Sequence, residues 1–209
     1  MKNSGEIIKV FDSEINDKLK VVLKNGKKLL NTKNTNYSYG TLVDVLEYGL
    51  DTIPVSEIKS VLLLGMGGGS IIKSLRNKYN CQAPVDAVEI DPVVIDIANK
   101  KFNIDKKAQL TIHCADAWDY IKNCKKEYDL IIVDIFIDVH VPEKFYKQEF
   151  WLEIEKNVSE NGFILFNAGI DLKETEVQEF VGKLPDSFIY QKNYYVLDTN
   201  TVIIMQKVF

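Results

Sequence analysis

A glycine-rich segment, followed by an acid at the spacing of a ribose-binding site, is the strongest chemical signal in this sequence. The apolar run 61–64 stops at Gly65-Met66-Gly67-Gly68-Gly69, and a second apolar run, 85–88, ends at Glu89. Glycines let the backbone approach a ligand closely and adopt positive φ. An acid at the tip of the second strand can accept hydrogen bonds from both hydroxyls of a ribose. We therefore expect Gly65, Gly67 and Glu89 to bind a nucleoside, although a strand-end acid can also be merely solvated.

Two further acids follow later apolar runs. Asp116 comes after the run 109–113 and could accept a hydrogen bond from an adenine amino group, but Asp is also a good N-cap for the helix expected next. Asp134 ends the run 128–133, which places a partly buried carboxylate at the pocket. Such a group can hold an amine nucleophile or take its proton. Because acids with perturbed pKa in clefts are usually functional, we favour a catalytic role for Asp134 over a structural role in the loop.

Four other side chains are candidates for a substrate pocket. Asp138 and His140 follow Asp134 in a loop, and Tyr37 and Tyr39 lie in a polar and aromatic segment near the N-terminus. The alternative for the first pair is a solvated loop, and for the tyrosines it is packing at the edge of the core.

Composition narrows the classes of function. The 209 residues suit one domain with a small appendage, and a hydrophobic content of 46% permits a sizeable core. The net charge of -4 argues against non-specific nucleic-acid binding, which relies on excess Lys and Arg. We see no apolar run of membrane-spanning length and no signal peptide. Three cysteines without metal-like spacing indicate reduced thiols. Together these features lead us to expect no bound metal, no association with a membrane and a cytoplasmic location.

The elements that must position these residues form an alternating pattern. A first helix is expected near residues 41–50, and from residue 60 onward apolar strands (61–65, 85–90, 109–113, 128–134, 162–167) alternate with helices (69–79, 92–101, 116–123, 143–157, 173–183). This pattern predicts a parallel sheet covered on both faces. The β runs after residue 187 have no convincing helix between them, so the sheet should end in an antiparallel hairpin.

The N-terminal segment differs from the rest. Residues 1–35 are predicted to form a short ribbon of two or three strands, turned at Asn25-Gly26, and residues 34–39 are expected to be a loop. Residues 36–209 are then a Rossmann-like α/β domain of the class I methyltransferase fold. A dinucleotide-binding dehydrogenase fits less well, because Gly65 to Ser70 supplies only the first half of Gly-x-Gly-x-x-Gly.

The sequence resembles the polyamine aminopropyltransferases, spermidine synthase and its relatives, over most of its length. The resemblance is carried, in order, by Leu64-Gly65-Met66-Gly67-Gly68-Gly69, Val88-Glu89-Ile90-Asp91, Asp116-Ala117, Tyr128-Asp129-Leu130-Ile131-Ile132-Val133-Asp134, Phe145-Tyr146-Lys147-Gln148-Glu149-Phe150 and Asn161-Gly162-Phe163.

The resemblance implies a donor, an acceptor and residue roles. The family transfers an aminopropyl group from decarboxylated S-adenosylmethionine to putrescine. Glu89 would hold the ribose, Asp116 and Ala117 the adenine, and Asp134 would activate the attacking amine. The resemblance also implies a small-molecule substrate and, through the N-terminal strands, a homodimer.

Departures from the family pattern concern the amines. The glycine turn's Asp, which in the family meets the donor's terminal amine, is Gly68 here, and the family's Asp-Ser-Ser-Asp-Pro is Asp134-Ile135-Phe136-Ile137-Asp138. An unpaired charge in a pocket is costly, so putrescine is expected to be a poor acceptor. Three hypotheses stay open: transfer of an aminopropyl or other alkyl group to a small amine, methyl transfer from S-adenosylmethionine to a small molecule, and nucleoside binding without catalysis.

Overall fold

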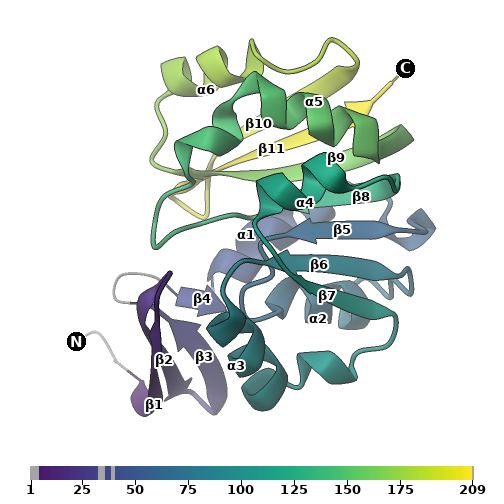
Figure 1. The fold of residues 1–209 in the computed structure, drawn as a ribbon. Coiled ribbons are helices and arrows are strands. Elements are labelled where there is room, and N and C mark those ends of the chain that lie inside the picture. The colour runs from purple at the N-terminus through teal and green to yellow at the C-terminus, as the bar shows by residue number, and fades with distance from the viewer. Residues whose placement is uncertain (1–4, 33–35, 39–40, 209) are drawn as a thin grey trace.

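The computed structural model describes residues 5–32, 36–38 and 41–208, with the backbone alone for 36–38, 41 and 42, and it contains two β-sheets in this part of the chain (Figure 1). The small N-terminal sheet is antiparallel, with the order β1-β2-β3-β4. The large sheet has seven strands in the order β10-β11-β9-β8-β5-β6-β7. The strands β9, β8, β5, β6 and β7 run parallel, and β11 pairs antiparallel to both β9 and β10. The expected α/β fold with a C-terminal antiparallel hairpin is therefore confirmed.

The small sheet is larger than the sequence predicts. Its strands are β1 (Glu6–Ser13), β2 (Asp17–Lys24), β3 (Lys27–Asn31) and β4 (Asn36–Ser38). The Asn25-Gly26 turn is confirmed, since both residues have positive φ, 51° and 74°. The loop expected over 34–39 is wrong in its centre, because residues 36–38 pair with β3. The sheet thus continues past the boundary expected at residue 35.

The strands of the large sheet follow the apolar runs, and six α-helices alternate with or precede them in the described chain. The strands are β5 (Val61–Leu64), β6 (Val85–Glu89), β7 (Leu110–Cys114), β8 (Tyr128–Val133), β9 (Val158–Ile170), β10 (Phe188–Val196) and β11 (Asn200–Lys207). The helices are α1 (Thr41–Leu50), α2 (Ser70–Asn77), α3 (Pro92–Phe102), α4 (Ala117–Asn123), α5 (Gln148–Asn157) and α6 (Glu174–Val181). Within the described ranges, no helix has the length and apolar character that crossing a bilayer requires.

One predicted helix is divided in two. The expected helix over 143–157 consists of a 3-10 turn, Glu143–Tyr146, and α5, with Lys147 in extended conformation between them. The expected strand over 162–167 is longer, because β9 begins at Val158 and runs to Ile170. The added residues at its C-terminal end extend the antiparallel pairing with β11, which runs from Gln206 to Asn200.

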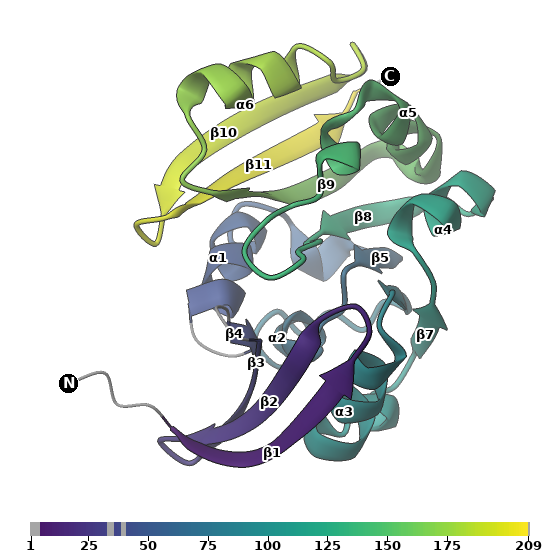
Figure 2. The ribbon, with the colours of Figure 1, turned by 60° about the vertical axis from the view of Figure 1, so that its left-hand side comes forward.

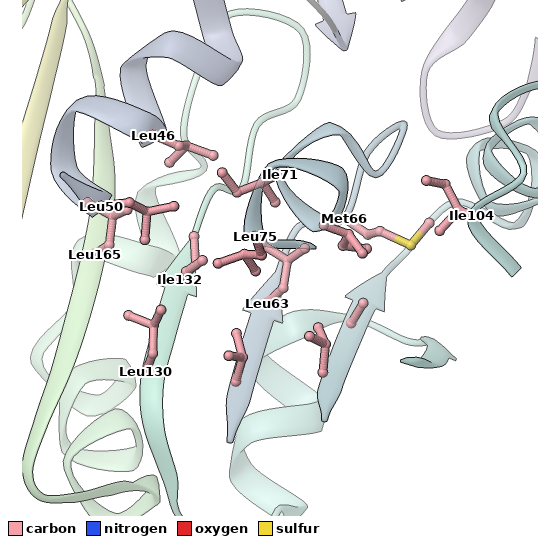
Figure 3. Close-up of a cluster of buried hydrophobic side chains, with 14 of the residues drawn as sticks. Leu46, Leu50, Leu63, Met66, Ile71, Leu75, Ile104, Leu130, Ile132 and Leu165 are labelled. Atoms are coloured by element: carbon pink, nitrogen blue, oxygen red, sulfur yellow. The ribbon is translucent and has the colours of Figure 1, made fainter. Parts of the chain in front are cut away.

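Side chains of the central strands alternate between two hydrophobic layers. Leu63 and Leu130 belong to the layer under α1, α2 and α3, whereas Leu62 and Ile131 belong to the layer under α4, α5 and α6. Figure 3 shows the first layer, in which Leu63 lies near Leu75. Strands buried on both faces explain the continuous apolar runs in the sequence. The parallel arrangement brings the carboxyl ends of β5, β6, β7, β8 and β9 to one edge, where a ligand would bind.

Candidate functional site

A cavity lies along that edge of the large sheet. Its lining includes Asp116 after β7, Glu89 at the end of β6, Gly65 after β5, Asp134 after β8 and Ile170 at the end of β9. The strand order therefore places Glu89 and Asp116 on one side of the glycine turn and Asp134 on the other. All five residues expected to hold a nucleoside (Gly65, Gly67, Glu89, Asp116, Ala117) line this one cavity together with Asp134.

Glu89 is held by backbone donors at the tip of β6. The side chain is only 6% exposed. Its Oε2 accepts the Gly67 N–H at 2.9 Å, and its Oε1 accepts the Asp91 N–H at 3.1 Å. Burial raises the pKa of Glu89, while these two N–H groups act in the opposite direction. A carboxylate offers about four acceptor positions, so roughly two remain for the hydroxyls of a ribose.

Gly65 brings the glycine turn against the loop that carries Asp134. Its φ is +90°, and a Cβ built there would lie 2.1 Å from the backbone oxygen of Asp134. No other residue type fits at that separation. The glycine turn is therefore in direct contact with the backbone at Asp134, with no side chain between them. This contact sets the position of the turn relative to the candidate base.

Asp116 combines the two roles that the sequence left open. Its Oδ1 accepts the N–H groups of Trp118 at 2.8 Å and Asp119 at 3.3 Å, so it is the N-cap of α4. Its Oδ2 accepts from Lys144 Nζ at 2.6 Å. Burial alone would raise the pKa of Asp116, but Lys144 and the two N–H groups outweigh it and lower the pKa. A ligand amino group at Oδ2 would have to share this oxygen with Lys144, which also lines the cavity.

Asp134 ends a chain of buried amides. Asn167 on β9 donates its Nδ2–H to Asp134 Oδ1 at 2.9 Å, and Asn200 on β11 donates to Asn167 Oδ1 at 3.0 Å. Asn167 is fully buried and Asn200 is 2% exposed. Burial raises the pKa of Asp134 to about 6, and the Asn167 amide holds it from rising further. A carboxyl with this pKa is largely ionised near neutral pH and still basic enough to take a proton from an ammonium group.

The residues proposed for a substrate pocket lie elsewhere or cannot be placed. Asp138 accepts a hydrogen bond from Thr32 Oγ1 at 2.8 Å, and its neighbour His140 is exposed; neither lines the cavity. The backbone of Tyr37 lies in β4, but its side chain is outside what the structure describes, and Tyr39 is outside the described residues altogether. The loop from Asp134 contributes Ile135, Phe136 and Ile137 to the cavity instead.

The N-terminal sheet supplies a wall that the sequence did not predict. Ser13 Oγ donates to Asp91 Oδ2, and Asn16 Nδ2 donates to the same oxygen at 2.7 Å. Asn16 and its neighbour Ile15 line the cavity. Figure 2 shows the β1–β2 hairpin reaching from the small sheet toward the middle of the molecule. The hairpin therefore joins the small sheet to the turn between Glu89 and α3.

Three contributions to the site were missed from the sequence: Lys144, Asn16 and Asn200. Lys144 lay within the helix predicted over 143–157, and Asn16 lay within the predicted N-terminal ribbon. Asn167 is the last residue of the strand predicted over 162–167, and this position was the one available signal for the amide chain. Among the residues that the structure describes, no group of three or more His, Cys, Asp or Glu side chains is placed to hold a metal ion.

The strand order, the glycine turn after β5 and the acid at the tip of β6 define a class I methyltransferase-like fold. The family model for the spermine/spermidine synthase domain matches residues 41–209. The chain belongs to this family.

Curated relatives of the chain include polyamine aminopropyltransferases. That of Vibrio vulnificus is 34% identical over 111 residues, which are 52% of this chain and 37% of that protein. That of Buchnera aphidicola is 27% identical over 149 residues, 69% of this chain and 52% of that protein. The chain thus spans about half or less of the length of these relatives.

Solved structures support the fold at low sequence identity. A probable spermidine synthase from Corynebacterium glutamicum matches with a TM-score of 0.78 at 15% identity, covering 96% of this chain and 80% of that one. Human methyltransferase-like protein 13 matches with a TM-score of 0.65 at 21% identity, covering 82% and 83%. The same fold is therefore shared by aminopropyltransferase-type and methyltransferase-type structures.

Proposed function

We propose that this protein transfers an aminopropyl group from decarboxylated S-adenosylmethionine to a small amine. The observation that carries the proposal is Asp134, a carboxyl with a pKa raised to about 6, in the same cavity as Glu89 and the glycine turn. The family of the chain supports the reaction type, since its curated relatives are aminopropyltransferases.

The reaction needs positioning and one proton transfer. Glu89 binds the ribose hydroxyls and Asp116 the adenine amino group, which holds the donor's sulfonium near the glycine turn. Asp134 takes a proton from the acceptor's ammonium, and the freed nitrogen lone pair attacks the methylene carbon attached to sulfur. The C–N bond forms as the C–S bond breaks, its electron pair goes to sulfur, and neutral methylthioadenosine leaves. Proximity and general-base catalysis together lower the barrier.

A second candidate is methyl transfer from S-adenosylmethionine to a small molecule. Gly68 favours it, because a glycine supplies no carboxylate for the amine at the end of an aminopropyl donor. The nucleoside end of the cavity would serve both donors equally, so the distinction lies in the group next to sulfur.

Calorimetric titration of the purified protein with S-adenosylmethionine, its decarboxylated form and methylthioadenosine tests the proposal. Tighter binding of the decarboxylated donor supports aminopropyl transfer, and tighter binding of S-adenosylmethionine supports methyl transfer. Failure to bind any of the three would leave nucleoside-dependent catalysis without a basis and would favour a non-catalytic relative.

The Glu89→Ala variant tests the placement of the nucleoside. We expect weaker methylthioadenosine binding, because the ribose loses a charged acceptor. Glu179→Ala is the matched control, since Glu179 lies on the exposed side of α6 and pairs with Lys183. Wild-type affinity in Glu89→Ala would show that the nucleoside binds elsewhere.

The three cysteines support a reducing compartment, such as the cytoplasm, for this activity. Cys81, Cys114 and Cys124 are all free thiols.

A further inference from the structure

Carboxylates are scarce in the cavity. Every Asp and Glu of the chain has a described side chain, since residues 1–4, 33–42 and 209 contain neither type. Glu89, Asp116 and Asp134 are the acids that line the cavity. The first two lie on the β6 and β7 side, where the nucleoside is placed, so Asp134 is the one lining carboxylate left for the amine groups of the donor side chain and of the acceptor.

The cavity wall on the side of Asp134 is largely apolar. Asp134 follows β8, which lies between β5 and β9, and α1 packs against α2, β9 and β11 on that side of the sheet. These elements and the loop after Asp134 line the cavity with Val43, Leu46, Ile71, Ile135, Phe136 and Ile170. Leu46 and Ile71 are also part of the hydrophobic layer under α1 and α2, so their positions are fixed by packing (Figure 3).

Two acids near this half of the cavity are engaged outside it. Asp138 accepts from Thr32, and Glu47 on α1 accepts from Ser74 and Lys78. Ser70 lines the cavity with a buried hydroxyl that has no hydrogen-bond partner in the described structure, but a hydroxyl carries no charge to balance a cation.

We infer that the acceptor is a primary amine whose remainder is an apolar chain, and that a diamine is disfavoured. The inference rests on the proposed transfer and names its acceptor class. Asp134 pairs with the single ammonium group and takes its proton, and the alkyl chain lies against the isoleucine-rich wall. The nitrogen then forms the C–N bond as the donor's C–S bond breaks, with the electron pair leaving on sulfur.

The second ammonium of a diamine would lie among these aliphatic side chains without a carboxylate, which is a large desolvation penalty. We expect kcat/KM for an n-alkylamine to exceed that for the α,ω-diamine of equal carbon number by about 100-fold. Lengthening the alkylamine by one methylene should raise kcat/KM by about fourfold until the cavity is filled.

The experiment compares butylamine, pentylamine and hexylamine with the diamines of four, five and six carbons. Decarboxylated S-adenosylmethionine is the donor, methylthioadenosine release is the rate measurement, and mass spectrometry identifies the alkylated amine. Equal or faster turnover of the diamines would overturn the inference while leaving the proposed transfer intact.

If no amine is turned over, a binding measurement tests the inference. That result would refute the proposed transfer, and titration of the methylthioadenosine complex with hexylamine and 1,6-diaminohexane would then test the apolar site by itself. Tighter binding of the monoamine supports the site, and equal or weaker binding overturns it.

A variant with a new acid provides an independent test. Val43→Asp adds a carboxylate to the apolar wall and should shift the diamine-to-monoamine ratio of kcat/KM toward the diamine by at least about tenfold. Ile189→Asp is the matched control, because Ile189 lies on β10 and is 55% exposed. An unchanged ratio in a folded Val43→Asp variant would contradict the placement of the second amine.

Discussion

Replacing Asn167 by Leu should raise the pKa of Asp134 and move the acid limb of the pH–rate profile upward. The Asn167 amide donates to Asp134 at 2.9 Å and opposes the effect of burial on a pKa of about 6. A hydrogen bond to a charged acceptor is worth about 1.5–3 kcal/mol and one to a neutral acceptor about 0.5–1.5 kcal/mol. The difference, about 1–1.5 kcal/mol, corresponds to roughly one pKa unit.

The assay is the dependence of kcat/KM on pH between 5 and 9, with carbon-13 NMR titration of the Asp134 carboxyl as a measurement that needs no activity. In the wild type, roughly nine-tenths of Asp134 is ionised at pH 7, given a pKa of about 6. In Asn167→Leu this fraction should fall to roughly half. Activity should therefore be reduced at pH 7 and recover at higher pH.

An effect of Asn167→Leu on stability must be distinguished from its effect on the pKa of Asp134. Asn167→Leu leaves Asn200 without an acceptor, at a cost of about 1–3 kcal/mol in the free energy of unfolding. Asn157→Leu is the matched control, because Asn157 is a buried amide that donates to Ile121 and Glu153 rather than to Asp134. An unshifted Asp134 titration in Asn167→Leu, or an equal shift in the control, would refute the electrostatic role of Asn167.

Two further substitutions separate chemistry from stability. Asp134→Asn should slow transfer by about 10²–10⁴-fold. It should also raise the free energy of unfolding at pH 8 by up to about 3 kcal/mol, because the pKa rises from 3.8 to about 6 on folding and ionising Asp134 therefore destabilises the folded state. This gain should disappear below pH 3.8 in chemical denaturation, and a gain independent of pH would contradict the burial argument. Asp116→Ala should cost about 1 kcal/mol through the lost N-cap, whereas Asp116→Asn should cost a few tenths at most. Calorimetry should show weaker methylthioadenosine binding in both Asp116 variants; wild-type affinity in Asp116→Asn would leave Asp116 with its capping role alone.

The parts of the fold that could be predicted are those with a local pattern. The central strands are continuous apolar runs because both faces of the sheet are covered, and Asn25-Gly26 specifies its own turn geometry. Strand β4 had no such pattern. Its three residues are polar or aromatic and become a strand by pairing with β3, which is a tertiary effect.

The candidate site was predictable to a similar extent. Glu89 and Asp134 end apolar runs, and the order of parallel strands brings such ends together. Contacts between residues far apart in sequence produce no regular spacing that could be recognised. Lys144 donates to Asp116, which is 28 residues away in sequence, and Ser13 donates to Asp91, which is 78 residues away. Side-chain pairs of this kind depend on the assembled fold and not on any periodicity of the chain.

The amide chain from Asn200 to Asp134 has a consequence for the order in which the protein matures during synthesis. The glycine turn, Glu89 and Asp116 all precede residue 117, whereas the environment of Asp134 is completed only when β11 pairs with β9. A nascent chain that lacks the last hairpin would already contain the glycine turn, Glu89 and Asp116, but it would lack the Asn200 amide that donates to Asn167. Under the proposed function, the residues that face the donor are therefore synthesised before the residues that complete the surroundings of the candidate base.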